Sequence, residues 1–193
     1  MYKSVLLNQC PINYYNTNSI IVHMTSRDKL GPYTFSDVAL RPRSPSFFDN
    51  SYVHAPFITR APDGTFALFY ETASVDHSGG YTTPNCTDGS HPAFPDPKSR
   101  RCMGVALSAS LAGPWKRGKE SILGDMCVPG GVESAADARD GGGMLLPPSS
   151  PGDVSNPAAI ILPNSSALLL YRYEAVNHEC IGVAFCPHYA GRW

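Results

Sequence analysis

The sequence predicts an all-β fold built from repeated antiparallel sheets. Apolar residues occur in short runs rich in Val, Ile, Leu, Phe and Tyr, separated by Pro, Gly, Asn, Asp and Ser, and helical periodicity is nearly absent. Two hairpin motifs and a repeated Gly-aromatic turn extend this pattern. The runs that predict strands are residues 19–24, 57–59, 66–71, 103–108, 158–162, 167–173 and 181–186.

Two pairs of these runs have the spacing of β-hairpins. Residues 61–65, Ala-Pro-Asp-Gly-Thr, join the runs that end in Phe-Ile-Thr and begin with Phe-Ala-Leu. Pro presets φ in such a turn, and Gly tolerates φ > 0. The same arrangement returns around residues 163–166, Pro-Asn-Ser-Ser, where Asn and Ser replace Asp and Gly.

A longer repeat groups the hairpins into larger units. The run at 21–26 is followed by Leu-Gly-Pro-Tyr, the run at 104–108 by Leu-Ala-Gly-Pro-Trp, and the run at 182–186 by Ala-Gly-Arg-Trp. His-Ala-Pro at 54–56 and its hairpin return as Asn-Pro at 156–157 with its own hairpin. Strand, turn, strand, loop, strand, Gly-aromatic turn and strand is the plan of a four-stranded propeller blade.

The repeat divides the chain into parts of one incomplete propeller domain. Residues 1–45 are expected to form the end of one blade, residues 50–125 a full blade, and residues 154–193 the start of the next. Two long polar segments, 74–101 and 125–153, are expected to be irregular, exposed loops. We therefore interpret the chain as a fragment of a propeller.

Composition argues against nucleic-acid and membrane partners. The formal net charge is -1 and charged residues make up 16%, so no basic stripe is available for phosphates. No apolar run approaches the roughly 20 residues that span a bilayer, and the first residues lack a signal-peptide pattern.

Two glycosylation sequons and six cysteines nevertheless favour a secreted, extracellular protein. The sequons are Asn85-Cys86-Thr87 and Asn164-Ser165-Ser166. Cys86 and Cys102 bracket a loop-like segment and could form a disulfide, although six cysteines allow many pairings. The alternative is a cytosolic protein with six free thiols.

The order of the motifs resembles glycoside hydrolase family 43 and its five-bladed relatives. The resemblance rests on His-Ala-Pro, Asp-Gly-Thr-Phe, Leu-Phe-Tyr, Gly-Val-Ala, Leu-Ala-Gly-Pro-Trp, and Asn-Pro with Leu-Leu-Tyr, in that order. It implies a five-bladed β-propeller with four-stranded antiparallel blades, of which about two to three are present. It also implies hydrolysis of glycosidic bonds in a plant- or algal-type polysaccharide or oligosaccharide by paired carboxyl groups.

The resemblance assigns most of the family's catalytic carboxyl groups to positions outside this chain. The family has an Asp base on its first blade, an Asp that tunes the acid on its third, and a Glu acid on its fourth. If His54 opens the second-blade motif, the only one of these positions within the chain holds Asn156, which can hydrogen bond a sugar but carries no charge. Two hypotheses remain: a glycosidase with rearranged polar groups, and a catalytically inactive carbohydrate-binding or interaction propeller.

Five further polar residues are candidate site residues. Asp49, just before an expected inner strand, is the candidate catalytic base. His54 could donate a hydrogen bond to a sugar hydroxyl or a carboxylate, or it could be a turn histidine bonded to the backbone. Glu71 and Glu174, assigned to equivalent strand ends, could bind substrate or be solvated. Arg172 could clamp an acidic sugar or form a cross-strand ion pair.

No metal site or cofactor is expected. The cluster that comes nearest to a metal-binding motif is His178, Cys180, Cys186 and His188. It lacks a Cys-x-x-Cys spacing, and the expected strand at 181–186 separates its members.

Overall fold

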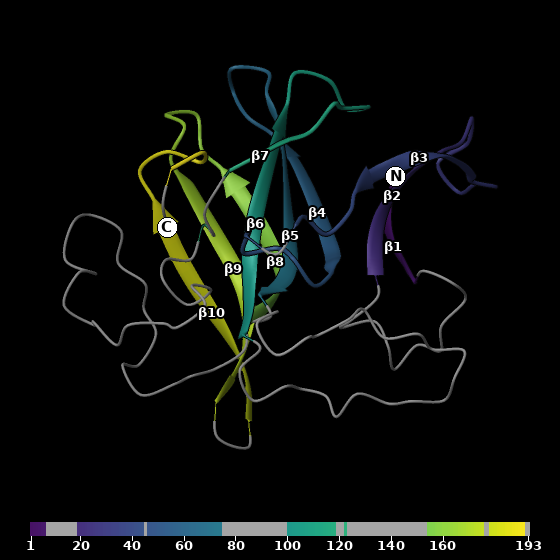
Figure 1. The fold of residues 1–193 in the computed structure, drawn as a ribbon. Coiled ribbons are helices and arrows are strands. Elements are labelled where there is room, and N and C mark those ends of the chain that lie inside the picture. The colour runs from purple at the N-terminus through teal and green to yellow at the C-terminus, as the bar shows by residue number, and fades with distance from the viewer. Residues whose placement is uncertain are drawn as a thin grey trace, which may run out of the picture.

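The computed structural model describes residues 1–6, 19–44, 46–74, 100–118, 122, 154–175 and 178–191. These residues form strands and no helix, so the predicted all-β class is confirmed for the described part of the chain. Figure 1 shows three antiparallel sheets that stand side by side. None of the described residues forms a helix that is long and apolar enough to cross a membrane.

The sheets follow one another along the chain. Sheet A has the order β1 (Tyr2–Leu6), β2 (Ser19–Thr25), β3 (Thr34–Leu40). Sheet B has the order β4 (Val53–Arg60), β5 (Phe66–Ser74), β6 (Arg100–Ser108), β7 (Lys116–Arg117). Sheet C has the order β8 (Val154–Ile161), β9 (Ala167–Ala175), β10 (His178–Cys186). Within the described residues only sheet B has the four strands expected of a blade.

The strand predictions hold for the apolar runs and for the strands that follow the first two Gly-aromatic turns. All seven predicted runs overlap strands, and β3 and β7 follow the Gly-aromatic turns as the blade plan expects, although β1, β3 and β7 were not among the apolar runs. The boundaries of the first predicted loop were wrong at both ends, because β5 reaches Ser74 and β6 starts at Arg100, whereas β8 starts at Val154, directly after the second predicted loop. The rest of the predicted loops lies outside the described residues, and the division into blades stays a prediction.

Both hairpins form as the turn residues predict. Gly64 has φ 90°, and in the second hairpin Ser165 takes this left-handed conformation with φ 67°. The Asp63 carboxylate accepts a hydrogen bond from the Thr65 amide at 2.9 Å, and the Asn164 side chain accepts one from the Ser166 amide at 3.1 Å. Asn and Ser therefore reproduce the turn made by Asp and Gly.

The Gly-aromatic turns also share one hydrogen-bond pattern. The carbonyls of Asp28, Ser110 and His188 accept hydrogen bonds from the amides of the glycines three residues later, at 3.0, 3.0 and 2.7 Å. In each turn the side chain of the same residue also accepts a hydrogen bond from the amide two residues later, at 2.8, 3.1 and 3.3 Å. The sequence repeat is therefore a structural repeat.

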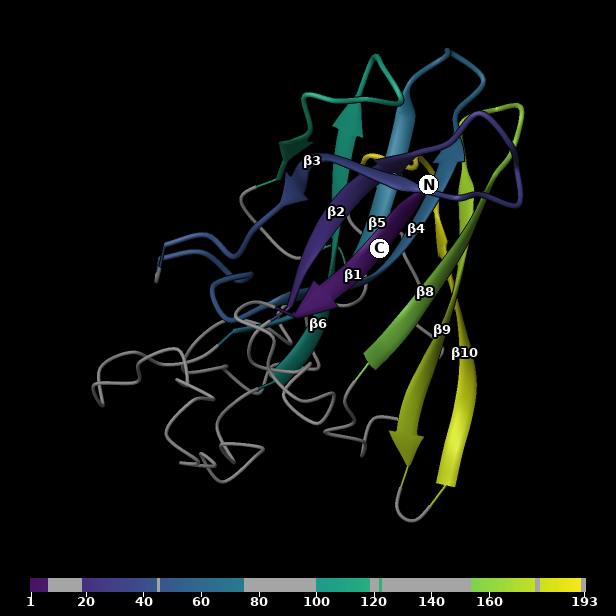
Figure 2. The ribbon, with the colours of Figure 1, turned by 90° about the vertical axis from the view of Figure 1, so that its right-hand side faces the viewer.

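The sheets pack face to face through two apolar layers. In Figure 2 the strands β1, β4 and β8 lie near one another, and β4 contacts both β1 and β8. The layer between sheets A and B includes Ile21, Leu40, Val53, Leu68, Tyr70 and Ala106. The layer between sheets B and C includes Phe69, Met103, Val105, Ala159, Leu169 and Tyr171.

Two glycines admit a tyrosine ring against the backbone of the next strand. A Cβ on Gly104 would lie 2.3 Å from the ring of Tyr70, and a Cβ on Gly182 would lie 2.4 Å from that of Tyr171. These distances are too short for any side chain, so both positions require glycine.

Candidate functional site

The inner strands of sheets B and C each begin with a bulged residue before proline. Ala55 has φ 44° and Asn156 has φ 51°, values that are rare for residues other than glycine. The strand pairing shifts at both places, between His54 and Phe57 and between Ser155 and Ala158. The bulges turn these residues out of the ladder, and the Asn156 side chain is exposed.

Each bulge is held by a side chain of the preceding sheet. The Ala55 amide donates to Ser4 Oγ at 2.9 Å, and the Asn156 amide donates to Glu71 Oε2 at 3.4 Å. Ser4 and Glu71 occupy equivalent positions on β1 and β5, because each pairs with the equivalent residue of the next strand. The side chains of Ser4 and Glu71 therefore hold the inner strand of the following sheet in place.

Glu71 is a buried carboxyl group at this end of the sheets. Its residue is only 2% exposed, and the Tyr52 hydroxyl donates to Oε1 at 2.9 Å. Burial raises the pKa of Glu71 above 4.5, against the opposing effects of the Tyr52 hydrogen bond and the nearby Arg101 charge. The expectation that Glu71 is either solvated or free to bind a sugar is thus not met.

His54 lies in β4, and its ring hydrogen bonds a side chain. Its Nδ1 is 3.1 Å from Ser19 Oγ, and the Ser19 hydroxyl donates to the Val53 carbonyl at 3.1 Å. Because that hydroxyl has one hydrogen, both bonds are satisfied when the neutral ring carries its proton on Nδ1 and donates it to Ser19 Oγ. Burial and then the Arg101 charge lower the pKa of His54 and so favour this neutral form.

Asp49, the predicted catalytic base, lies between sheets A and B with no exposed surface. Its carboxylate pairs with Arg43 Nε and with Arg117 Nη1 at 2.8 Å, and the Tyr70 hydroxyl donates to it at 2.9 Å. Burial and then the Asp49 charge raise the pKa of Tyr70 well above its usual value. The prediction is corrected on this ground: a carboxylate enclosed by two arginines has a structural role and cannot reach a substrate.

Arg172 forms the predicted cross-strand ion pair, and Glu174 does not occupy the predicted position. Arg172 Nη2 is 2.9 Å from Glu179 Oε1 on β10. In sheet B, the residue paired just before the bulge is His54, and its partner is Glu71. In sheet C, the residue paired just before the bulge is Ser155, and its partner is Arg172. Arg172, and not Glu174, is therefore the counterpart of Glu71. The side chain of Glu174 lies outside the described part of the structure.

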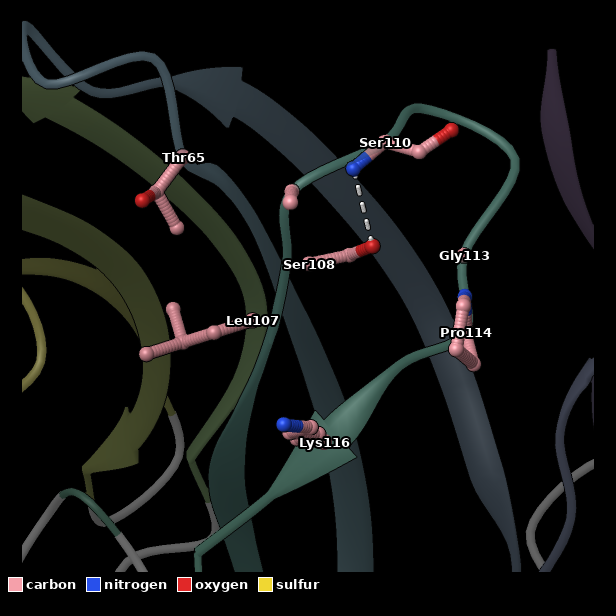
Figure 3. A pocket seen from close by; sticks show the side chains of 8 residues that line it. Thr65, Leu107, Ser108, Ser110, Gly113, Pro114 and Lys116 are labelled. Carbon is pink, nitrogen blue, oxygen red and sulfur yellow. Dashed lines mark hydrogen bonds between the residues drawn. The ribbon is translucent and has the colours of Figure 1, made fainter.

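His54, Glu71 and Asn156 meet at one end of the sheets, where β1, β5 and β9 end and β4 and β8 begin. Sequence reasoning selected all three but missed Ser4 and Ser19, whose contacts come from distant segments. A hollow of about 500 Å³ lies at the other end, beside the turn between β6 and β7 (Figure 3). Its lining is mostly small or apolar, with Lys116 as the charged side chain.

The cysteines and histidines of the described residues form no group of three or more potential metal ligands. Cys102 is disulfide-bonded, whereas Cys180 and Cys186 are thiols outside any disulfide. Cys86, its predicted partner, lies outside the described residues.

Comparison with known proteins shows similarity at the level of the fold. No family model and no curated protein matches the sequence. The structure matches Zg3597, a family 117 glycoside hydrolase of the marine bacterium Zobellia galactanivorans, with a TM-score of 0.54 and 20% identity over 90% of this chain and 40% of that chain. A Penicillium chrysogenum α-L-arabinanase complexed with arabinobiose gives a TM-score of 0.48, 12% identity, and coverage of 95% and 40%. An endo-arabinase of Bacteroides thetaiotaomicron gives 0.45, 14%, and coverage of 94% and 50%.

The chain spans 40% of the length of the family 117 enzyme. Similarity to family 43 in particular stays a prediction. The three antiparallel sheets of this chain therefore have a glycoside-hydrolase-like fold.

Proposed function

We propose that this protein belongs to a five-bladed propeller glycoside hydrolase that cleaves glycosidic bonds in a polysaccharide or oligosaccharide. The observation that carries the proposal is the pair of bulged inner-strand starts, which bring His54 and Asn156 to one end of the sheets with Glu71 between them. The fold similarity to a glycoside hydrolase and the family 43 motifs support it.

Asn156 is the proposed sugar-binding residue. Its exposed side-chain amide belongs to a strained, bulged residue. Pro157 follows this residue, and the hydrogen bond from the backbone amide of Asn156 to Glu71 holds it in place. A fixed backbone limits the directions of the amide, as a preorganised hydrogen-bonding group requires. His54, at the same end of the sheets, is proposed to contact a second hydroxyl of the sugar.

Glu71 is proposed as a positioning residue for Asn156. Glycoside hydrolysis needs two carboxyl groups that reach the scissile bond, and Glu71 is buried with a donor on each oxygen. We therefore assign the acid and the base to parts of the propeller other than the described residues. Secretion is also proposed, and the disulfide at Cys102 supports it.

A catalytically inactive carbohydrate-binding propeller is the second candidate. Asn156 favours it, because an uncharged amide stands where family 43 has an aspartate. Extending the gene model in both directions separates the two functions. An Asp that opens an earlier blade and a Glu that opens a later one support the enzyme, and a complete five-blade reading frame with neither supports the binder.

The binding site is tested by calorimetry with arabino-, xylo-, galacto- and fuco-oligosaccharides. Asn156→Ala is expected to weaken binding about 3- to 10-fold, the effect of one neutral hydrogen bond. Lys116→Ala, at the other end of sheet B, is the control and should leave binding unchanged. A loss of affinity in the control but not in Asn156→Ala would move the site to the opposite end.

A further inference from the structure

The turn between β8 and β9 carries a glycosylation sequon at the surface. Asn164-Ser165-Ser166 has the required pattern, with a residue other than proline in the middle and a hydroxyl two residues after the asparagine. An N-linked glycan is bulky and needs a surface position. Pro163 and Asn164 are both exposed at the tip of the turn. The other sequon, at Asn85, lies outside the described residues.

The hydrogen bonds of the turn fix the orientation of the Asn164 side chain. Its Oδ1 accepts hydrogen bonds from the Ser166 amide at 3.1 Å and from the Ser166 hydroxyl at 2.7 Å. Because a backbone N–H needs an acceptor, the oxygen of the side-chain amide faces Ser166, and the nitrogen lies on the other branch. Within the described part of the chain, both hydrogen bonds of this side chain are made by the oxygen. A sugar attached to Nδ2 would therefore leave the turn intact.

The equivalent turn of sheet B uses its side chain differently. Asp63 Oδ1 accepts a hydrogen bond from the Thr65 amide at 2.9 Å, as Asn164 Oδ1 does from the Ser166 amide. The second oxygen of Asp63 accepts one from the Tyr189 hydroxyl at 2.9 Å, so both branches of that carboxylate have partners. Aspartate and asparagine both make turns of this kind. The turn alone therefore does not require an asparagine at position 164.

The sequon lies far from the proposed sugar-binding residue. Asn156 is near the start of β8, whereas Asn164 follows the end of that strand at Ile161. At about 3.3 Å per residue, the strand separates the two asparagines by roughly 15 Å or more. A glycan on Asn164 would thus stand at the opposite end of sheet C and leave the proposed site open.

We propose that Asn164 carries an N-linked glycan, transferred from a lipid-pyrophosphate-linked oligosaccharide in the secretory pathway. In this transfer one N–H bond of Nδ2 breaks, and a bond forms between Nδ2 and the anomeric carbon of the first sugar. The lipid pyrophosphate leaves, the proton is released, and nothing is oxidised or reduced. The inference rests on the proposed secretion and not on hydrolytic activity.

Peptide mapping of the full-length natural protein, purified from its own source, tests the proposal. Peptide-N-glycosidase in heavy-oxygen water converts a glycosylated asparagine to labelled aspartate, which mass spectrometry locates in the sequence. We expect the label at residue 164. The same digestion without the glycosidase is the control for spontaneous deamidation. An unlabelled peptide with an unmodified Asn164 would overturn the proposal.

Two variants of Ser166, expressed in the same host, test whether the modification depends on the sequon. Ser166→Thr retains the hydroxyl and should keep the label at Asn164, whereas Ser166→Ala removes the hydroxyl and should abolish the label. A label that persists in Ser166→Ala would contradict N-linked transfer.

Sugar binding is measured separately, by calorimetry before and after enzymatic removal of the glycan. Because the sequon and the proposed site lie at opposite ends of sheet C, the affinity for oligosaccharides should not change. An unmodified Asn164 in a secreted protein that binds sugar would overturn this inference alone. A glycosylated Asn164 in a protein that binds no sugar would overturn the proposed function alone.

Discussion

Replacing Asp49 by asparagine should destabilise the protein without removing a catalytic group. The substitution keeps the side-chain volume but leaves Arg43 and Arg117, whose side chains are 14% and 16% exposed, without their counter-charge. Removing one partner of a buried ion pair lowers the free energy of unfolding by about 3–5 kcal/mol. Because both arginines retain some contact with solvent, we expect the lower end of this range, about 3 kcal/mol.

The effect is measured by urea and thermal unfolding. A loss of about 3 kcal/mol lowers the Tm of a chain of this size by roughly 6–12 °C. Asp37→Asn is the matched control, since Asp37 pairs with His23 but its side chain is 50% exposed, and it should change stability by less than about 1 kcal/mol. A double-mutant cycle with Arg117→Gln should give a coupling energy of about 1–3 kcal/mol.

An activity assay tests whether Asp49 is instead a catalytic base. Residues 1–193 are expected not to hydrolyse aryl arabinosides, xylosides, galactosides or fucosides at a useful rate. If they show robust turnover that Asp49→Asn abolishes, with the stability unchanged, Asp49 is the base and the structural assignment is wrong.

Three other substitutions follow from the geometry. Because burial raises the pKa of Glu71, the folded state binds the proton more tightly, so stability should fall as pH rises from 4.5 through the raised pKa. Glu71→Gln should flatten that part of the pH profile of urea unfolding, and an unchanged slope would contradict the shift. Gly104→Ala forces the Tyr70 ring to move and should cost about 2–3 kcal/mol, whereas an unshifted Tm would show that the ring is mobile. Gly113→Ala, at φ 88°, should cost about 1–2 kcal/mol in the same assay, and no loss would mean that the turn relaxes.

The fold class and the hairpins could be predicted because they depend on local chemistry. Alternating apolar runs and turn residues specify strands and their neighbours, as at Gly64 and Ser165. The strands β1, β3 and β7 were not among the apolar runs, and β3 and β7 were expected only from the blade plan, as the strands that follow the Gly-aromatic turns. Their place is set by pairing with β2 and β6, which sequence periodicity does not report.

The site was predicted in part, since the residues at the inner-strand starts were found but their roles were not. Asp49 lies next to β4 in sequence, yet its partner Arg43 follows β3 of sheet A and its partner Arg117 lies in β7, at the edge of sheet B. Glu174 was matched to Glu71 by counting along the strand, and the bulge-shifted register assigns Arg172 instead. Long-range pairing of this kind is absent from a single sequence.

The Gly-aromatic turns show how the repeat survives changes of residue type. A carboxylate, a hydroxyl and an imidazole, on Asp28, Ser110 and His188, each cap the same backbone loop. The turn therefore selects for a short side chain with a lone pair and for the glycine that follows, and not for one residue. A search for further repeats in a longer form of this protein should score hydrogen-bond acceptors at this position, because a search for aspartate alone would recover one of the three turns.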